Sequence, residues 1–396
     1  MKETRFKDTE IGRIPEDWNR SNLGSICKVK RGIRITKDQL TPTGKYPVFQ
    51  NTNYPMGFYS HYNVEANTPF VIIGGSAGLI GCCKTHYWAA DDCAYFSYGA
   101  RIIHSFLYYE LLHRKSELQN NVKTASVPRL DRKVLEGLVF PLPPLSEQNR
   151  IASALTSIDN LISSLDKLIE KKKAIKEGTM QQLLTGKKRL KGFNEPWYHY
   201  TLGDCTTIKA RIGWQGLTAS EYLDYGQYYL VTAIDINEGK ISWDTCHYVS
   251  EERYLQDKNI QILPFDVLVS KDGTIGKVAF LDSLPGPGTL NSGVFVIRSK
   301  MKYLTQEYLA QVFLSKYFDN FIKEIVAGST IVHLYQKDIV KFSFDAPSSI
   351  KEQQAIVSFI SSINEEIASL ESKRNKYIKT KQGMMQQLLT GRIRLV

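Results

Sequence analysis

Apolar residues recur in two stretches of the chain at alternating steps of three and four positions. The first stretch has Ile151, Leu155, Ile158, Ile162 and Leu165 at these positions, and the second has Ile356, Ile360, Ile363, Ile367 and Leu370. Such a heptad seam is typical of a helix that packs along a partner helix. The sequence therefore predicts two long helices that pair through these residues. An ordinary helical hairpin inside one core is the alternative, although globular helices rarely keep a strict heptad over this length.

Small residues mark the expected ends of both helices. Ser146 follows Pro143, Pro144 and Leu145 and is a candidate N-cap of the first helix. Gly178 and Gly383 are candidate breaks or ends. Gly186 and Gly391 are expected close to the helix ends, because glycine is favoured just after the last helical turn.

The two helical stretches belong to a repeated segment. Residues 178–186 recur almost unchanged as residues 383–391, which lie 205 positions later. The same offset extends backwards without a gap to Glu147 and Glu352. Because no gap is needed over the whole segment, the chain is interpreted as a tandem repeat.

Weaker matches extend the repeat into the variable parts of the chain. Trp18 matches Trp197, which lies 179 positions later, and residues 69–81 match residues 264–276 at an offset of 195. The offset therefore grows along the chain, which predicts insertions of 16 and 10 residues in the second copy.

The repeat predicts an α+β protein in which two mixed α/β domains are separated by two long antiparallel coiled-coil helices, with a pseudo-twofold relation. The expected segments are residues 1–145, 146–190, 191–345 and 346–396. The second domain connects the C-terminal end of the first helix to the N-terminal end of the second. Domain termini are often close together, so the helices are expected to run antiparallel. By the same symmetry, Trp18 is expected beside the last residues of the chain.

Both variable domains combine strand and helix patterns. Strands are predicted at residues 70–73, 265–269 and 294–297, and helices at residues 106–118 and 305–325. The first two strands lead into glycine-containing turns.

Composition adds a functional hint. The net charge of +11 and the pI of about 9.1 are typical of a protein that neutralises phosphate, although charge alone does not separate a nucleic-acid-binding protein from other basic proteins. The apolar runs are too short to span a bilayer and the N-terminus lacks an apolar signal region, so a cytoplasmic location without a membrane partner is expected.

The loops of both domains contain side chains that can contact DNA bases or phosphates. The candidates, chosen by charge and by position after a strand, are Arg31, Arg34, Ser76 and Leu79 in the first domain and Lys209, Arg211, Lys271 and Thr274 in the second. For any one of them, an ordinary surface residue is the simpler interpretation.

The sequence lacks the motifs of several enzyme classes. It has no phosphate-binding loop, no dinucleotide-binding glycine pattern and no Asn-Pro-Pro-aromatic motif of an amino-group methyltransferase. No catalytic residues are therefore predicted. Cys82, Cys83, His86 and Cys93 could be arranged as a zinc site, but the matching stretch of the second domain has no ligands, so buried thiols are favoured and no metal is predicted.

Together these features resemble the specificity subunit of type I restriction-modification systems. The resemblance covers essentially the whole chain. It rests on the opening Ile14-Pro15-Glu16-Asp17-Trp18, on the Pro-rich residues 140–145, and on Met-Gln-Gln-Leu-Leu-Thr-Gly after each helix. In the second copy the Pro-rich lead-in is reduced to Ala346-Pro347-Ser348.

The resemblance implies a non-catalytic subunit whose two target-recognition domains each read one half of a bipartite, asymmetric site in double-stranded DNA. It implies two methyltransferase subunits as partners, joined by motor-nuclease subunits in restricting complexes. S-adenosylmethionine, ATP and magnesium belong to those partners, and no cofactor is expected in this chain. The helices are expected to space the half-sites and to dock the methyltransferases.

Two other functions remain to be separated from this one. A self-contained restriction or methylating enzyme would carry the motifs that the sequence lacks. A coiled-coil adaptor that binds only proteins would show no salt-sensitive affinity for DNA.

Overall fold

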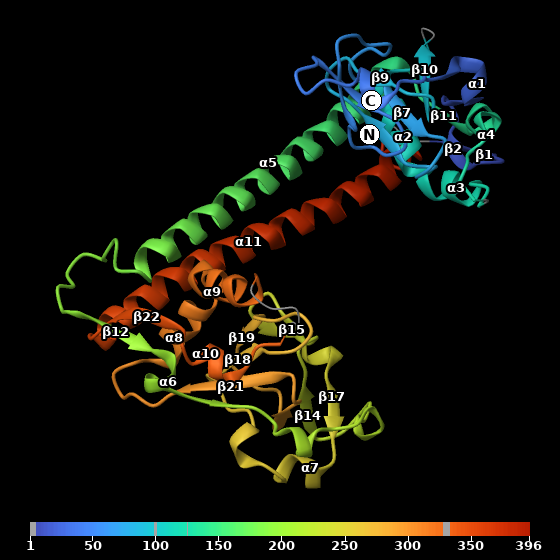
Figure 1. Cartoon of the computed structure of the whole chain (residues 1–396). Coiled ribbons are helices and arrows are strands. Elements are labelled where there is room, and N and C mark those ends of the chain that lie inside the picture. The colour runs from blue at the N-terminus through green and yellow to red at the C-terminus, as the bar shows by residue number, and fades with distance from the viewer. Residues whose placement is uncertain (1–4, 99–100, 125, 328–332) are drawn as a thin grey trace. The chain divides into compact units, whose positions relative to one another are not determined.

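The computed structural model describes residues 5–98, 101–124, 126–327 and 333–396 (Figure 1). The chain forms two compact units: unit 1 comprises residues 1–167 and 371–396, and unit 2 comprises residues 168–370. Each unit contains part of both long helices, α5 (Leu145–Leu183) and α11 (Ile350–Leu388). The division into four consecutive segments stays a prediction.

Unit 1 is built mainly from short strands. They are β1 (Phe6–Thr9), β2 (Gly12–Pro15), β3 (Asn19–Asn22), β4 (Cys27–Arg31), β5 (Tyr46–Phe49), β6 (Gly57–Tyr59), β7 (Pro69–Ile72), β8 (Ile80–Cys82), β9 (Trp88–Ala89), β10 (Cys93–Tyr98) and β11 (Val139–Leu142). The shorter helices are α1 (Leu23–Ile26), α2 (His104–His113), α3 (Lys115–Asn120) and α4 (Arg132–Gly137).

Unit 2 repeats this composition. Its strands are β12 (Trp197–Thr201), β13 (Thr206–Lys209), β14 (Tyr228–Val231), β15 (Ile236–Asn237), β16 (Lys240–Ile241), β17 (His247–Val249), β18 (Val267–Ser270), β19 (Val278–Phe280), β20 (Gly288–Leu290), β21 (Val294–Ser299) and β22 (Ser343–Pro347). Its shorter helices are α6 (Leu202–Cys205), α7 (Glu251–Leu255), α8 (Gln306–Phe313), α9 (Lys316–Ala327) and α10 (Gln336–Ile339).

The sheets of the two units have the same topology. Unit 1 has an antiparallel sheet in the order β4-β10-β7-β8, and unit 2 has β13-β21-β18-β19. Next to it, the sheet β6-β5-β9 corresponds to β17-β14-β20, and in each the pair formed with β9 or β20 is parallel. In each unit a further antiparallel pair joins a strand near the start of the domain to the strand that precedes the long helix. The pair is β3–β11 in unit 1 and β12–β22 in unit 2. The structure therefore confirms the α+β class and the tandem repeat.

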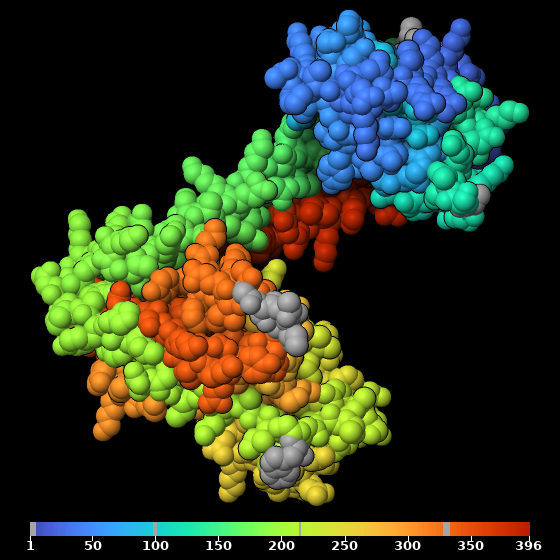
Figure 2. All heavy atoms as spheres, in the orientation of Figure 1, coloured from blue at the N-terminus to red at the C-terminus, as the bar shows by residue number. Residues whose placement is uncertain are grey.

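Each core lies between the four-stranded sheet and the helices beside it. In unit 1, α2 packs on β7 and β8, and in unit 2, α8 packs on β18, β19 and β21. Leu388 and Leu389 belong to the core of unit 1 together with Trp18. Figure 2 shows the red end of α11 against the blue and teal atoms of that unit.

The long helices pair antiparallel, as predicted. In unit 2, Ile169 of α5 packs with Ile363 and Ile367 of α11. Charged side chains beside the seam form ion pairs between the two helices. In order along α5 they are Asp159–Lys381, Asp166–Arg374 and Lys172–Glu366. Partner numbers on α11 fall as those on α5 rise, which is the pattern of antiparallel helices.

The seam residues proposed for helix pairing occupy two environments. Ile151 and Leu155 are part of the globular core of unit 1, and Ile356 and Ile360 are part of that of unit 2. The remaining seam residues lie along the middle of the helices. Of these, Ile158, Leu165, Ile363 and Ile367 are buried, whereas Ile162 and Leu370 are half-buried.

The ends of the long helices agree with the sequence expectation at Gly186 and Gly391 and differ from it elsewhere. They continue through Gly178 and Gly383, where an added Cβ atom would meet no described neighbour within 4 Å. Gly186 and Gly391 follow the helix ends with φ of +67° and +69°, as glycine permits. At the other end, α5 begins one residue before Ser146, because the Pro144 carbonyl accepts the first hydrogen bonds.

The helix predicted over residues 305–325 is two helices. Ser315 separates α8 from α9: its hydroxyl donates to the Val312 carbonyl and accepts from the Tyr317 backbone N–H. A serine that satisfies backbone groups in this way competes with a continuous helix. The helix predicted over residues 106–118 is likewise divided into α2 and α3.

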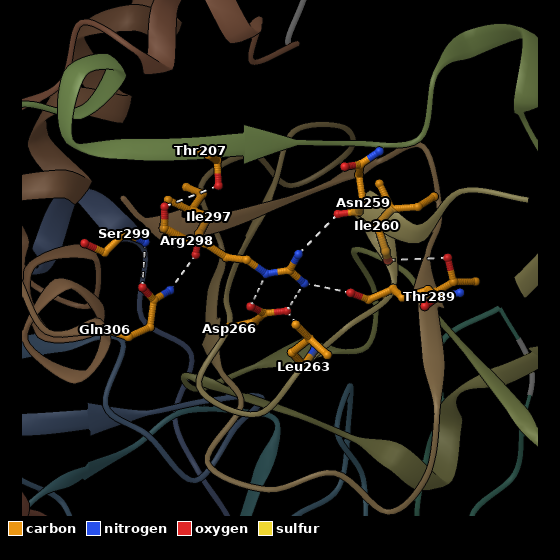
Figure 3. Close-up of polar contacts among 11 residues, drawn as sticks. Thr207, Asn259, Ile260, Leu263, Asp266, Thr289, Ile297, Arg298, Ser299 and Gln306 are labelled. Atoms are coloured by element: carbon orange, nitrogen blue, oxygen red, sulfur yellow. Dashed lines mark hydrogen bonds and ion pairs between the residues drawn. The ribbon is translucent and has the colours of Figure 1, made fainter. Parts of the chain in front are cut away.

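An ion pair between the partly exposed Arg298 and the buried carboxylate of Asp266 ties the strands of unit 2 together (Figure 3). Arg298 of β21 donates from Nε and Nη2 to the two carboxylate oxygens of Asp266, each at 2.6 Å. It also donates to the Gln261 carbonyl at 2.7 Å, and Asp266 accepts from the Leu263 N–H at 2.8 Å. This bidentate pair therefore fixes the segment that enters β18 against the end of β21.

Candidate functional site

One glycine turn follows the same strand in each unit. In unit 1 it is Gly75-Ser76-Ala77-Gly78, and in unit 2 it is Gly273-Thr274-Ile275-Gly276. Both glycines of each turn have positive φ, between +67° and +84°. The turn closes when the last glycine N–H donates back to the strand, at 2.8 Å in unit 1 and 2.9 Å in unit 2. Ser76 and Thr274 are thus equivalent, and both are exposed.

This equivalence corrects the alignment made from sequence. The sequence match paired Gly78 with Gly273 at an offset of 195, whereas the backbone pairs Gly78 with Gly276 at an offset of 198. The expected insertions of 16 and 10 residues therefore become 19 and 7. Glycine recurs every three residues in this stretch, so the sequences of the two units can be aligned in more than one way. Only the positions with positive φ identify which residues correspond.

Two other loops meet each turn. Directly after β7, the Ile73 N–H donates to the Asp92 carbonyl, and the Ile73 carbonyl accepts from Leu130. Directly after β18, Lys271 makes the same two bonds with Gly293 and Leu334. We call these clusters the loop edges: residues 73–78, 90–92 and 126–130 in unit 1, and residues 271–276, 291–293 and 333–335 in unit 2.

The candidates of the first domain lie in different surroundings. Ser76 is at the loop edge, and Arg31 reaches it from β4, because its Nε donates to the Asp91 carbonyl at 2.6 Å. Arg34 is exposed in the segment after β4. Leu79 is half-buried against an apolar cluster that includes Phe70. Arg31 and Ser76 therefore both belong to or contact the loop edge of unit 1, through different loops, whereas Leu79 has a packing environment.

The DNA-contact candidates of the second domain also lie in different surroundings, some at the loop edge and some away from it. Thr274 and Lys271 lie at the loop edge, where the Lys271 ammonium is 3.6 Å from Asp272 and 5.7 Å from the Phe295 ring centroid. Lys209 is exposed at the end of β13.

Arg211 does not have the exposed position expected of a DNA contact. It is 2% exposed, and its guanidinium donates to the Leu290 carbonyl at 2.9 Å and to the Thr289 hydroxyl at 3.2 Å. Burial lowers its pKa. These contacts tie Arg211 to β20, so we leave it out of the proposed DNA-contacting set.

Sequence reasoning did not select Arg129 and His333, which lie at equivalent points of the two loop edges. Each directly precedes the leucine that anchors its loop to the strand end. Arg129 lies 3.8 Å from Asp92, and His333 pairs with Asp272. No motif surrounds either residue, and only the shared backbone bonds reveal that they correspond.

The three cysteines considered as metal ligands differ in burial: Cys93 is buried, Cys83 is half-buried and Cys82 is exposed, so the expectation of buried thiols holds only for Cys93. Cys93 is buried, its thiol donates to the Phe49 and Gln50 carbonyls, and burial raises its pKa. His86 instead lies 3.2 Å from the Glu65 carboxylate. Within the described residues, no three His, Cys, Asp or Glu side chains are grouped so that they could hold a metal ion.

The repeated Glu-Gln pair at the start of each long helix holds the domain to the helix. Gln148 accepts from the Ile103 N–H and donates to the Pro143 carbonyl, and Gln353 makes the same bonds with Thr305 and Pro347.

Among the described helices, none is both long and apolar enough to cross a lipid bilayer.

Comparison with known proteins places the chain in one family. The family model for the type I restriction modification DNA specificity domain matches residues 15–177 and again residues 194–380. The MjaVIII specificity subunit of a type I restriction enzyme from Methanocaldococcus jannaschii is 24% identical over all of this chain and 97% of its own length.

Two solved structures share the fold. The crystal structure of a type I restriction-modification S subunit from M. genitalium matches with a TM-score of 0.65 and 17% identity, over 94% of this chain and 96% of that one. A chain solved in work on complex assembly and conformational transition of the type I restriction-modification system matches with a TM-score of 0.60 and 15% identity, over 96% and 99%. The chain belongs to the type I restriction-modification DNA specificity family and is the specificity subunit, with two target-recognition domains and no catalytic role of its own.

Proposed function

We propose that the two loop edges face double-stranded DNA and that each reads one half of a bipartite, asymmetric site. One observation carries this proposal: the same three loops meet in both units on the same backbone frame, but they present different side chains. Ser76 corresponds to Thr274, and Arg129 corresponds to His333. A shared frame with different side chains is what two readers of different base sequences require.

The chemistry of the loop edges suits this task. Arg31 and Lys271 supply positive charge for phosphates, and hydroxyl and guanidinium groups can bond to base edges in the major groove. The net charge of +11 supplies the sequence-independent part of the affinity, which is expected to fall with salt.

The long helices are proposed to set the distance between the half-sites and to dock two methyltransferase subunits. Each helix has 39 residues, or roughly 58 Å at about 1.5 Å per residue. In unit 2, Leu168 and Ile175 of α5 are 39% and 45% exposed and lie one heptad apart. An exposed apolar stripe of this spacing suits a partner helix. In restricting complexes, motor-nuclease subunits would join.

Exchange of one recognition domain tests the assignment of half-sites. Replacing residues 202–344 by the corresponding segment of another family member is expected to change one half-site and to leave the other unchanged. The reason is that each loop edge is built within one unit. Methylated adenines would be mapped in cells that express the chimaera with its methyltransferase.

The matched control is exchange of residues 23–140, which have the same place in unit 1 by the strand registers. It should change only the other half-site. If either exchange altered both halves, the assignment of one half-site to each domain would be wrong.

Lengthening the helices tests their role as a spacer. Seven residues would be inserted after Ile169 and seven after Leu370, which lie in the same apolar cluster, so that the seam keeps its register. This adds roughly 10 Å, or about three base pairs, to the helix pair. We expect some activity to be lost because the added length also rotates the second half-site around the DNA axis. Where methylation persists, the gap should widen with both half-sites unchanged.

The control keeps the helix length and replaces the seven residues before each insertion point by the inserted sequence. It should leave the gap as it is in the original protein. Full methylation at an unchanged gap by the lengthened subunit would mean that the helices do not set the spacing.

A further inference from the structure

In each loop edge, the residue directly before the anchoring leucine places a cationic or imidazole side chain against a carboxylate, and in unit 2 the same carboxylate also lies 3.6 Å from the Lys271 ammonium. In unit 1 the Arg129 guanidinium lies 3.8 Å from the Asp92 carboxylate. In unit 2 the His333 imidazole pairs through Nδ1 with Asp272. The arrangement is thus repeated, while the side chain that the carboxylate orients is different.

The carboxylate reaches this position from different loops in the two units. Asp92 of unit 1 corresponds to Gly293, and Asp272 of unit 2 corresponds to Gly74. A Cβ atom at Gly74 would collide with the Asp92 carboxylate, and a Cβ atom at Gly293 would lie 3.7 Å from that of Asp272. The two carboxylates therefore occupy nearly the same space, and where one loop supplies the acid the other has glycine.

Comparison of the two loop edges shows which feature they share and which feature differs between them. A carboxylate is present in both units although different residues supply it, and its partner is arginine in one and histidine in the other. The Arg129 side chain is 61% exposed and that of His333 is 27% exposed, so both can still reach a ligand. A carboxylate beside an exposed donor limits its rotamers and fixes its direction, which recognition of a base edge requires.

We propose that Arg129 and His333 are the specificity-determining residues of their half-sites, each aimed by its carboxylate into the major groove. This inference rests on the proposed function of the loop edges. The planar guanidinium of Arg129 matches the two acceptors of guanine, O6 and N7. His333 contacts one base of the other half-site through Nε2, because Nδ1 is engaged by Asp272.

The test uses the full subunit expressed with its methyltransferase, with methylated adenines mapped across the genome. Arg129→Ala is expected to reduce the preference for guanine at one position of one half-site by about 10-fold, the effect of losing a bidentate base contact. His333→Ala is expected to relax one position of the other half-site. Arg129→Lys keeps the charge but loses the fork, so it should relax the same position as Arg129→Ala.

Two matched controls remove the same groups elsewhere in the same units. Arg132→Ala removes an exposed arginine three residues after Arg129, at the start of α4. His199→Ala removes an imidazole that also pairs with an aspartate, Asp345 at 2.9 Å, but lies on β12. Both variants should retain the original recognition sequence.

The outcomes separate this inference from the function on which it rests. An unchanged recognition sequence in Arg129→Ala and Arg129→Lys would overturn the inference, as would a uniform drop in methylation with no change in the preferred bases. If the domain exchanges still moved one half-site each, the proposed function would stand without it. If the exchanges failed as well, the loop edges would not be the DNA-reading surface.

Discussion

Replacing Arg394 by methionine is expected to destabilise unit 1 by about 3–5 kcal/mol, because it leaves a buried carboxylate without its ionic partner. Glu147 is 2% exposed, and both its oxygens accept from the Arg394 guanidinium at 2.7 Å. The same guanidinium bonds to Asp17 at 2.8 and 2.9 Å. Hydrogen bonding to Glu147 raises the pKa of Arg394, so the arginine stays charged.

The loss would be measured by denaturant unfolding, and hydrogen exchange would locate it. Faster exchange is expected around Trp18, whose indole N–H also donates to Glu147 at 2.9 Å. The hydrogen bond from Arg394 holds the pKa of Asp17 below its usual value. The stabilisation from the Asp17–Arg394 pair is therefore fully present above the ordinary carboxyl pKa, and it is lost as the pH falls through the lowered pKa of Asp17. The difference between the original protein and the variant should accordingly shrink in acid.

Unit 2 offers the matched variant. Arg189 donates to Glu352 at 2.9 and 2.5 Å, and Glu352 is fully buried. Arg189→Met should give a loss of similar size with faster exchange in unit 2. Arg392→Met removes an exposed arginine near the same terminus and should change stability little. If both variants lost less than about 1 kcal/mol, the buried carboxylates would not depend on their arginine partners, and the prediction would be contradicted.

Replacing Glu110 by glutamine is expected to stabilise unit 1 by about 4 kcal/mol at pH 8 and above. Glu110 lies in α2, is 1% exposed, and neither carboxylate oxygen has a hydrogen-bond partner among the residues that the structure describes. The Arg114 Nε atom is 3.9 Å away. Burial raises the pKa of Glu110 to about 8, because the charged form is poorly solvated there.

The pH dependence has a definite sign. The folded chain holds the Glu110 proton up to about pH 8, whereas the unfolded chain loses it near 4.5. Between these values the folded state binds more protons, so stability should fall as the pH rises, by at most about 1.4 kcal/mol per pH unit. Above pH 8 the dependence from this residue should end. Glu110→Gln should remove the slope and be nearly neutral at pH 4.5.

The repeat supplies a second variant. The helix-start bonds pair Ile103 with Thr305, so Glu110 corresponds to Val312, which is buried in α8. Glu110→Val should therefore fit the fold and also remove the slope. Glu117→Gln, at an exposed acid of the same region, should keep it. If the gain in stability from Glu110→Gln were the same at pH 5 and pH 8, Glu110 would not be the group that titrates.

The long helices and their direction could be predicted from the sequence. The heptad of Ile151 to Leu165 and its copy repeat at short range, and a pattern of this kind survives whatever surrounds it. Connectivity then fixed the antiparallel order, and it also placed Trp18 beside the last residues, where the Arg394 guanidinium lies 5.4 Å from the Trp18 ring centroid. The resemblance of the repeated motifs to type I specificity subunits implied two DNA-reading domains, whereas the net charge of +11 alone did not.

The loop edges depended on the tertiary structure. The sequence alone did not show which glycines correspond, because glycine recurs three residues apart in both units. Positive φ and the hydrogen bonds from Gly78 and Gly276 to their strands decided the correspondence. Arg211 has the charge of a DNA contact, but the β20 backbone and Gln256 hold it inside the domain. Arg129 and His333 share no surrounding motif, and they correspond because long-range backbone bonds bring their loops to the same strand end. A heptad is set by residues a few positions apart, whereas these positions are set by contacts between segments far apart in the chain.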